Sequence, residues 1–269
     1  FPVLDGLHSF LVGAKSLMAY RDYLARPTMS LPKISKILIS KWQERFNDNP
    51  VVEEHEVGEF LSDFGMPVIK STLIRNKEEF LDCLPELKYP VVMKTAMEGV
   101  SHKSDVRGVV LNIENEEGLQ ACYDDMSSRL GPKVLIAAMN NNYGIEMILG
   151  IARDKQFGPL IIMGFGGVNA EILNDVAVLK PPFDANTALR YLKGLKMKEC
   201  LYGVRGNSAV DVSSFCNIAS LVSVLAIEFE NQIVELDINP LKILEKNCMA
   251  LDALLVLGND STRPAKTSS

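Results

Sequence analysis

The spacing of apolar residues along the chain predicts helices and strands in alternation. Apolar positions three and four residues apart predict helices at residues 10–24, 33–46, 54–64, 76–83, 116–130, 185–195 and 212–229. Short runs rich in Val, Ile and Leu predict strands at residues 67–73, 90–95, 109–113, 134–139, 145–151, 159–163, 233–238 and 249–255. This alternation favours an α/β domain.

Glycines, prolines and polar runs mark the breaks between these elements. Residues 164–167, Gly-Phe-Gly-Gly, follow a predicted strand, and we expect a tight loop there because glycine is unfavourable inside a strand. Residues 26–32 contain two prolines and predict a linker after the first helix. The polar residues after Gly258 predict a disordered tail.

Composition and charge exclude several classes of protein. The chain has 269 residues, 47% hydrophobic and 23% charged, which is typical of a globular chain and excludes a disordered or collagen-like one. Its longest apolar stretch, residues 220–227, is far shorter than the roughly 20 residues of a membrane-spanning helix, so we expect no membrane contact. A formal net charge of -6 provides no general positive field, so we expect no nucleic-acid partner.

The cysteines and the first residues bear on the cellular setting. The five cysteines are scattered, and none forms a Cys-x-x-Cys pair that would indicate zinc or a disulfide-exchange site. The start of the chain has no basic segment followed by an apolar run and a small-residue cleavage site, so we expect no secretory signal. Both observations predict a reducing, cytoplasmic setting.

Three histidines are available for chemistry, and one of them stands apart. His102 lies in a polar loop between two apolar strands, where a packing role has little support. A neutral imidazole is a good nucleophile for a phosphoryl group, and Lys103 and Asp105 lie close enough in sequence to neutralise charge and orient the ring. The alternative is an ordinary surface histidine. His8 and His55 lie in charged helical surroundings, and we expect no chemistry from them.

Lys94 ends the apolar strand predicted at residues 90–95. A charge at the tip of a buried strand costs several kcal/mol without an anionic partner, and a nucleotide phosphate is such a partner. The alternative is a lysine whose ammonium group extends to water.

Oxygen-bearing side chains converge near the end of the chain. Asp237 and Asn239 alternate with apolar residues and share one face of a strand, and Asp252 lies on the strand that returns. Such ligands suit Mg²⁺ held by one or two side chains and by phosphate oxygens. The alternative is a solvated polar face. Further isolated charges lie beside glycine-containing turns: Glu146, Arg153, Glu171, Asp175 and Arg205.

Five segments, taken in order, resemble one known family. They are YPVVMK, SHKSDVRGVVL, GIEMILGIARDKQFGPLIIMGFGGVNAEIL, GVRG and ELDINPL. Together they are similar to the ATP-grasp part of the ADP-forming acyl-CoA synthetases, relatives of succinyl-CoA synthetase, over about residues 51–257. The first 27 residues resemble the last strand and helix of the CoA-ligase domain that precedes it in that family.

The resemblance implies an ATP-grasp fold of the α/β class, with two α+β subdomains that clasp Mg-ATP. We therefore expect residues 1–46 to be the end of the preceding ligase domain and a helical linker. Residues 47–258 would form the ATP-grasp domain, with subdomains at about 47–133 and 134–258. Residues 259–269 would form the disordered tail.

The resemblance also implies an activity, in which a carboxylic acid, CoA and ATP give acyl-CoA, ADP and phosphate. The cofactors would be ATP/ADP and Mg²⁺, with CoA in the missing domain. By position, Lys94 corresponds to a phosphate-contacting lysine and His102 to the histidine that carries phosphate to the ligase site. Asn239 and Asp252 correspond to metal ligands, and Asp237 to the acidic residue that faces the ligase domain's own phosphohistidine. The other nucleotide-cleft positions are Glu146, Arg153, Gly164, Gly166, Gly167 and Arg205.

The sequence departs from the family pattern at three positions. Arg107 replaces the first of two glycines that usually follow HKSDV, and Ala137 and Ala138 stand where a Gln-Pro pair is common. These departures leave the choice between ATP and GTP open. The resemblance implies the CoA-binding and ligase domains of the same protein as partners, and it leaves the acid and any homo-oligomer undetermined.

A second interpretation is a degenerate ATP-grasp module with a regulatory or scaffolding role, like the synthetase-like regions of some protein acetyltransferases. Retention of Lys94, His102, Asn239 and Asp252 argues against it, because drift has no reason to spare all four.

Overall fold

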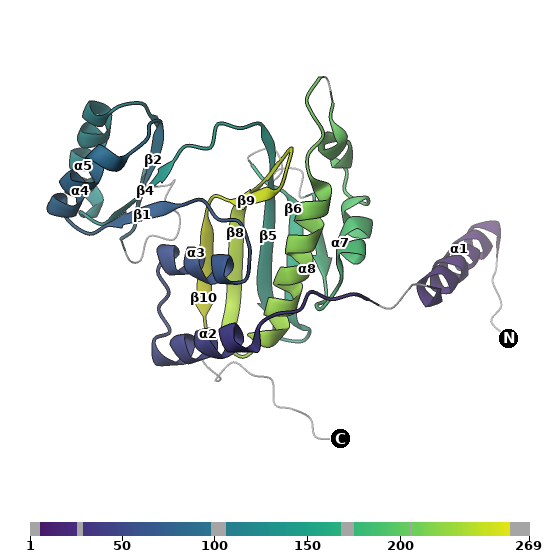
Figure 1. The fold of residues 1–269 in the computed structure, drawn as a ribbon. Helices are drawn as coiled ribbons and strands as arrows, with labels where there is room; N and C mark the ends of the chain where they lie inside the picture. The colour runs from purple at the N-terminus through teal and green to yellow at the C-terminus, as the bar shows by residue number, and fades with distance from the viewer. Residues whose placement is uncertain (1–5, 26–28, 98–105, 168–174, 205, 259–269) are drawn as a thin grey trace. The chain divides into compact units, whose positions relative to one another are not determined.

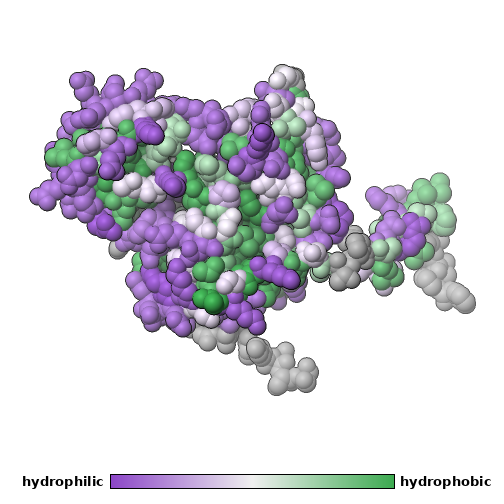
Figure 2. All heavy atoms as spheres, viewed as in Figure 1, coloured by the Kyte–Doolittle hydropathy of each residue, from purple (hydrophilic) through white to green (hydrophobic). Residues whose placement is uncertain are grey.

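The computed structural model describes residues 6–25, 29–97, 106–167, 175–204 and 206–258 (Figure 1). Contacts divide the chain into two units, residues 1–30 and 31–269. The first unit contains α1 (Gly6–Leu24), which confirms the helix predicted there. None of the side chains described in α1 is buried, and its hydrophobic residues lie on the surface (Figure 2).

The larger sheet of the second unit is antiparallel throughout. Its strand order is β10-β8-β5-β6-β7, and β9 pairs with the end of β8. The strands are β5 (Gly144–Asp154), β6 (Gly158–Phe165), β7 (Val176–Leu179), β8 (Ile233–Leu244), β9 (Cys248–Ala250) and β10 (Ala253–Leu257). Because alternate residues point to opposite faces, each strand supplies one set of side chains to the core and another to the outer face.

Helices cover one face of this sheet. α7 (Ala185–Leu192) and α8 (Val212–Glu228) lie across it (Figure 1), and α2 (Lys36–Asp48) and α3 (Glu54–Asp63) pack into the same core. An aromatic cluster joins α2 and α3 to the end of α8. Within this cluster the ring of Phe60 lies 5.2 to 5.4 Å from four other rings, those of Trp42, Phe46, Phe64 and Phe229.

The smaller sheet has its own core. Its order is β1-β4-β2-β3, and its strands are β1 (Ser71–Ile74), β2 (Val91–Thr95), β3 (Val109–Ile113) and β4 (Val134–Ala138). α4 (Lys77–Cys83) and α5 (Glu116–Leu130) cover one face, where Met93 and Ile136 are buried. Lys94 and its Cα partner Leu135 therefore lie on the opposite face. Two short 3₁₀ helices, Leu84–Glu86 and Lys198–Tyr202, also lie among the described residues.

Two boundaries in the structure differ from those that the sequence predicts. The sequence predicts a linker through residue 46, whereas α2 buries Ile39, Trp42 and Phe46 in the large core. Their spacing of three and four residues gives α2 one apolar face, so α2 belongs to the folded domain. The predicted division at residue 134 would also separate β4 from its sheet, whereas β4 pairs with β1 and β2.

The strand ends also differ from the prediction. Gly164 lies inside β6 rather than in the predicted loop. Glycine is required at this position of the strand because a Cβ would meet the carbonyl oxygen of Asp175. β8 continues through residue 244, and the strand predicted at residues 249–255 is two strands, β9 and β10, separated by Leu251 and Asp252. The sequence analysis also missed β7, which has only four residues.

Among the described residues, no helix is both long enough and apolar enough to cross a membrane.

Candidate functional site

Lys94 joins the small sheet to the larger one. Its Nζ donates a hydrogen bond of 2.9 Å to the carbonyl oxygen of Leu251, and it lies 3.0 Å from Asp252 Oδ2 and 3.5 Å from Glu54 Oε1. The side chain is only 13% exposed. Of the two interpretations of this lysine, the structure therefore favours a shielded charge with anionic partners.

Asp237, Asn239 and Asp252 lie together at the same place. In β8, Leu236 and Ile238 are buried, so Asp237 and Asn239 share the other face, as their alternation predicts. The backbone N–H of Asn239 donates a 3.1 Å hydrogen bond to the carbonyl oxygen of Asp252. β8 and the β9–β10 connection thus bring two carboxylates and one amide into a single cluster.

The pKa of Asp237 lies above its ordinary value. Burial is the main cause, because it disfavours the charged form, and the carboxylate of Glu235 is the next. A hydrogen bond from the Asn239 side chain acts in the opposite direction, and the negative charge of Asp252 raises the pKa further. The negative charges of Glu235 and Asp252 thus add to the effect of burial on this carboxyl.

A cavity of about 730 Å³ opens beside Lys94 and Asp252. Leu135 and Ala137 of β4 line it on the small-sheet side, and residues of α3 line it on the other. Its volume is within the roughly 300–1,000 Å³ of small-molecule sites. The cavity thus receives side chains from both cores, including Ala137, one of the positions where the sequence departs from the family pattern.

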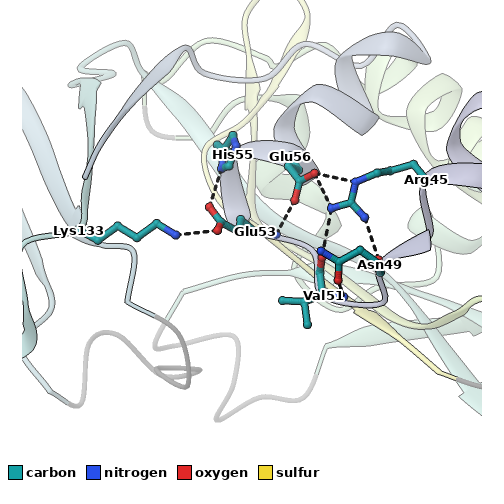
Figure 3. A network of polar contacts seen from close by, with 7 residues as sticks. All are labelled: Arg45, Asn49, Val51, Glu53, His55, Glu56 and Lys133. Atoms are coloured by element: carbon teal, nitrogen blue, oxygen red, sulfur yellow. Dashed lines mark hydrogen bonds and ion pairs between the residues drawn. The ribbon is translucent and has the colours of Figure 1, made fainter. Parts of the chain in front are cut away.

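Figure 3 shows the polar network at the start of α3. Glu53 precedes the helix, and its Oε1 lies 2.7 Å from Lys133 Nζ of the small subdomain, a contact that lowers the pKa of Glu53. His55 Nδ1 lies 3.3 Å from the other carboxylate oxygen of Glu53. The carboxylate of Glu56 accepts hydrogen bonds from the backbone N–H of Glu53 and from Arg45. The network holds the first turn of α3 against the small subdomain.

Glu146 and the predicted glycines meet at the start of β5. The backbone N–H of Gly166 donates a 2.9 Å hydrogen bond to the carbonyl oxygen of Glu146. Gly167 has φ of +80°, and a Cβ there would lie 3.9 Å from Glu146 Oε2. The cross-strand partner of Glu146 is Lys242, three residues along β8 from Asn239, or about 10 Å by strand rise. Glu146 and these glycines therefore border the same end of the sheet.

Arg153 lies away from this group. It is seven residues along β5 from Glu146, a separation of about 23 Å. Its guanidinium donates hydrogen bonds to the carbonyl oxygens of Glu230 and Ile233, at 2.6 Å for the latter. These contacts hold the turn before β8, so the structure does not bring Arg153 to the cluster around Asp252.

Asp175 has a structural position as well. Its carboxylate is buried and accepts hydrogen bonds of 2.8 Å from the backbone N–H groups of Lys196 and Met197. Five other positions named from the sequence lie outside the described residues: His102, Lys103, Asp105, Glu171 and Arg205.

The remaining two histidines differ from each other. His8 lies on α1 and is exposed, as we expect from its surroundings. His55 is 27% exposed and contacts Glu53, so it is more enclosed than a surface residue and lines the cavity.

Sequence reasoning missed Glu54 at the site and Arg129 beside the residues that follow the His102 segment. Glu54 is one of several helical charges, and nothing in its local pattern shows that Lys94 lies opposite. Arg129, on α5, donates hydrogen bonds to the carbonyl oxygens of Val106 and Arg107. Arg107 has φ of +52°, a region that favours glycine, and Arg129 holds this backbone directly after the segment that contains His102.

Comparison with protein-family models shows the family to which this chain belongs. The model of the ATP-grasp domain matches residues 45–257. The chain belongs to the ATP-grasp family. The resemblance and the fold class expected from the motifs are therefore confirmed.

The relatives of this ATP-grasp chain include ADP-forming acyl-CoA ligases. It is 36% identical over 218 residues to the beta subunit of ADP-forming acetate-CoA ligase I of Pyrococcus furiosus, covering 78% of this chain and 93% of that subunit. It is 32% identical over 242 residues to the ADP-forming 4-hydroxybutyrate-CoA ligase of Nitrosopumilus maritimus, covering 84% of this chain. The chain spans only 34% of the latter protein.

A solved structure shares the ATP-grasp fold at similar identity. It is that of the dinucleotide-forming acetyl-coenzyme A synthetase 1 of Candidatus Korarchaeum cryptofilum, with a TM-score of 0.69 and 32% identity, covering 84% of this chain and all of that one. That protein is in complex with coenzyme A and Mg-AMPPCP, and its phosphohistidine segment points towards the nucleotide-binding site.

Proposed function

We propose that this ATP-grasp chain binds Mg-ATP and transfers the γ-phosphate to His102, as the nucleotide-binding part of an ADP-forming acyl-CoA ligase. The overall reaction converts a carboxylic acid, CoA and ATP into acyl-CoA, ADP and phosphate. The observation that carries the proposal is the position of Lys94. It extends from the small sheet to carboxylates supplied by α3 and the β9–β10 connection, beside a cavity of suitable size for a nucleotide.

Lys94 would neutralise phosphate charge. Phosphoryl transfer depends on alignment and charge neutralisation more than on covalent chemistry by the protein. The ammonium group already binds anionic oxygen at Asp252, and a phosphate oxygen is an acceptor of the same kind. Glu146, with Gly166 and Gly167 beside it, would border the same cleft, and we retain Arg205 as a proposed nucleotide contact.

Asn239 and Asp252 suit Mg²⁺ by their chemistry. Mg²⁺ prefers oxygen ligands and is usually bound by one or two side chains together with phosphate oxygens and water. Within the described residues, no group of three or more His, Cys, Asp or Glu side chains could hold a metal. The bound ion would neutralise developing charge on the phosphates.

His102 would carry the phosphate. Its imidazole nitrogen attacks the γ-phosphorus, a nitrogen–phosphorus bond forms as the bond to the ADP oxygen breaks, and ADP leaves. The phosphate would then pass to a second histidine, which belongs to the ligase domain. We propose that Asp237 is the hydrogen-bond partner of that second histidine. Its carboxylate lies on the outer face of β8, where an approaching imidazole N–H can donate a hydrogen bond to it.

The acid and the partners would be set outside this chain. The relatives are named for acetate and for 4-hydroxybutyrate, although both match the same domain. We therefore propose that the acid pocket and the CoA site lie in ligase domains of the same protein or of a partner subunit. All five cysteines are free, which supports the cytoplasmic setting that we propose. Self-association stays a prediction.

The experiment that tests this function is labelling with ATP that carries radioactive γ-phosphate, in the presence of Mg²⁺. We expect acid-labile, alkali-stable label on the protein and on a His8→Asn control, and no label on His102→Asn. Thermal denaturation with Mg-ATP runs in parallel, because a ligand at about 100 times its Kd adds roughly 2.7 kcal/mol of stability. A stabilised but unlabelled protein would contradict phosphoryl transfer and favour the degenerate module. No stabilisation would contradict nucleotide binding.

A further inference from the structure

We propose that Glu54 is a positioning residue that holds the ammonium group of Lys94 when Mg²⁺ and phosphate occupy Asp252 and the neighbouring cavity. The inference rests on the nucleotide-binding role proposed for Lys94. It assigns a function to a side chain whose sequence pattern gives no such indication.

The three contacts of Lys94 come from two places. Two acceptors, the Leu251 carbonyl and the Asp252 carboxylate, belong to the β9–β10 connection, and the third is Glu54 on α3. An ammonium group has three donors, so these acceptors match its capacity. Asp252 is also the proposed metal ligand, and its carboxylate would turn to the cation. Among the carboxylates that contact Lys94 in the described structure, Glu54 would then remain to hold it.

α3 presents Glu54 from a fixed backbone. Glu54 is the first residue of the helix and follows a capping box formed by Glu53 and Glu56. One turn further, Val57, Phe60 and Leu61 are all buried in the large core. The lysine side chain has a flexible four-carbon stem, so a partner on a rigid element reduces the freedom that phosphate binding would otherwise have to remove.

The contact is partly shielded from water. The side chain of Glu54 is 18% exposed and that of Lys94 is 13% exposed. Surface ion pairs contribute little because water and salt screen them, whereas a shielded pair is screened less. A contact of this kind can therefore affect the position of Lys94 measurably.

Positioning and simple electrostatics predict opposite results for Glu54. A carboxylate near the phosphates repels them, so if Glu54 acts only as a charge, Glu54→Gln should bind ATP more tightly. If Glu54 positions Lys94, the same variant should bind ATP more weakly. Glu59 provides a matched control, because it is another α3 carboxylate that lines the same cavity and lies outside the polar network at the start of the helix.

The experiment measures Mg-ATP affinity by titration calorimetry on the intact chain and on the variants Glu54→Gln, Glu59→Gln, Lys94→Gln and the double variant of Glu54 and Lys94. We expect Glu54→Gln to weaken binding about five-fold in the natural chain and not at all in the Lys94→Gln chain, since contacting residues are not additive. Glu59→Gln should not weaken binding. Glu54→Asp, which keeps the charge, should restore part of the affinity, and its thermal denaturation shows whether the fold persists.

Two results would overturn the inference. The first is that Glu54→Gln binds ATP as tightly as the natural chain or more tightly. The second is that removal of the Glu54 charge weakens ATP binding equally in the natural chain and in the Lys94→Gln chain, which would mean that Glu54 does not act through Lys94. Failure of the proposed function has a different signature. In that case Lys94→Gln alone would leave ATP affinity unchanged.

Discussion

Removal of residues 1–46 should unfold the ATP-grasp domain, whereas removal of residues 1–30 should leave it folded. The two truncations differ only by α2 and the residues before it. α2 contributes Ile39, Trp42 and Phe46 to the core, and these side chains are 9%, 4% and 3% exposed. The comparison therefore tests whether α2 is part of the domain or part of a linker.

The magnitude follows from burial. Each fully buried side chain of this size contributes about 1.5–3 kcal/mol, so the three contribute roughly 5–9 kcal/mol together. Ring contacts of Trp42 and Phe46 with Phe60 add about 0.5–1.5 kcal/mol each. Because whole domains have a free energy of unfolding of only about 5–15 kcal/mol, loss of α2 removes most of the stability.

The assay is thermal and urea denaturation followed by far-UV circular dichroism. The chain has one tryptophan, Trp42, so its fluorescence also reports whether α2 stays packed in the chain that starts at Leu31. Trp42→Ala in the intact chain should cost about 3–5 kcal/mol. A chain starting at Asn47 that melts within about 3 °C of the chain starting at Leu31 would refute the reasoning, because that difference corresponds to roughly 1 kcal/mol in a domain of this size.

Four further substitutions test the structure. Gly164→Ala should destabilise the fold by about 1–3 kcal/mol in urea denaturation, because the added Cβ would meet the carbonyl oxygen of Asp175. Gly58→Ala should stabilise α3 by roughly 0.5–1 kcal/mol in the same assay, because its Cβ would lie at an ordinary contact distance of 3.5 Å from Val68. Arg153→Gln should lower stability by about 1–3 kcal/mol and leave ATP affinity unchanged in calorimetry, because its contacts are to carbonyls far from the cluster. Asp237→Asn should raise stability at pH 7 by about 0.5–2 kcal/mol. The pKa of the Asp237 carboxyl is raised in the folded state, so its contribution to stability is present below the ordinary pKa and is lost as the pH rises through the raised pKa. The stability that Asp237→Asn gains, measured by thermal denaturation, should therefore shrink as the pH is lowered towards 4.

Local sequence pattern predicts most of the elements and places Asp237 and Asn239 on one face of a strand. Apolar periodicity located the helices because one buried face repeats every three or four residues, as Val57, Phe60 and Leu61 do in α3. Strict alternation placed Asp237 and Asn239 together because a strand has a period of two. These are local rules, and they apply before any long-range contact forms.

Which elements share a core, and which side chains meet, depends on contacts between distant segments. The period of α2 is visible in the sequence, but its partner Phe229 lies far along the chain, so local pattern could not distinguish a core helix from a linker helix. The sequence predicts Gly164 in a loop, whereas in the structure it lies in a strand beside Asp175, whose carbonyl oxygen leaves no room for a side chain. Glu54 and Lys94 are 40 residues apart, and Asp252 is much further, so their contact depends on how two separate cores pack. Packing of that kind depends on shape and burial between distant segments, which no local spacing specifies.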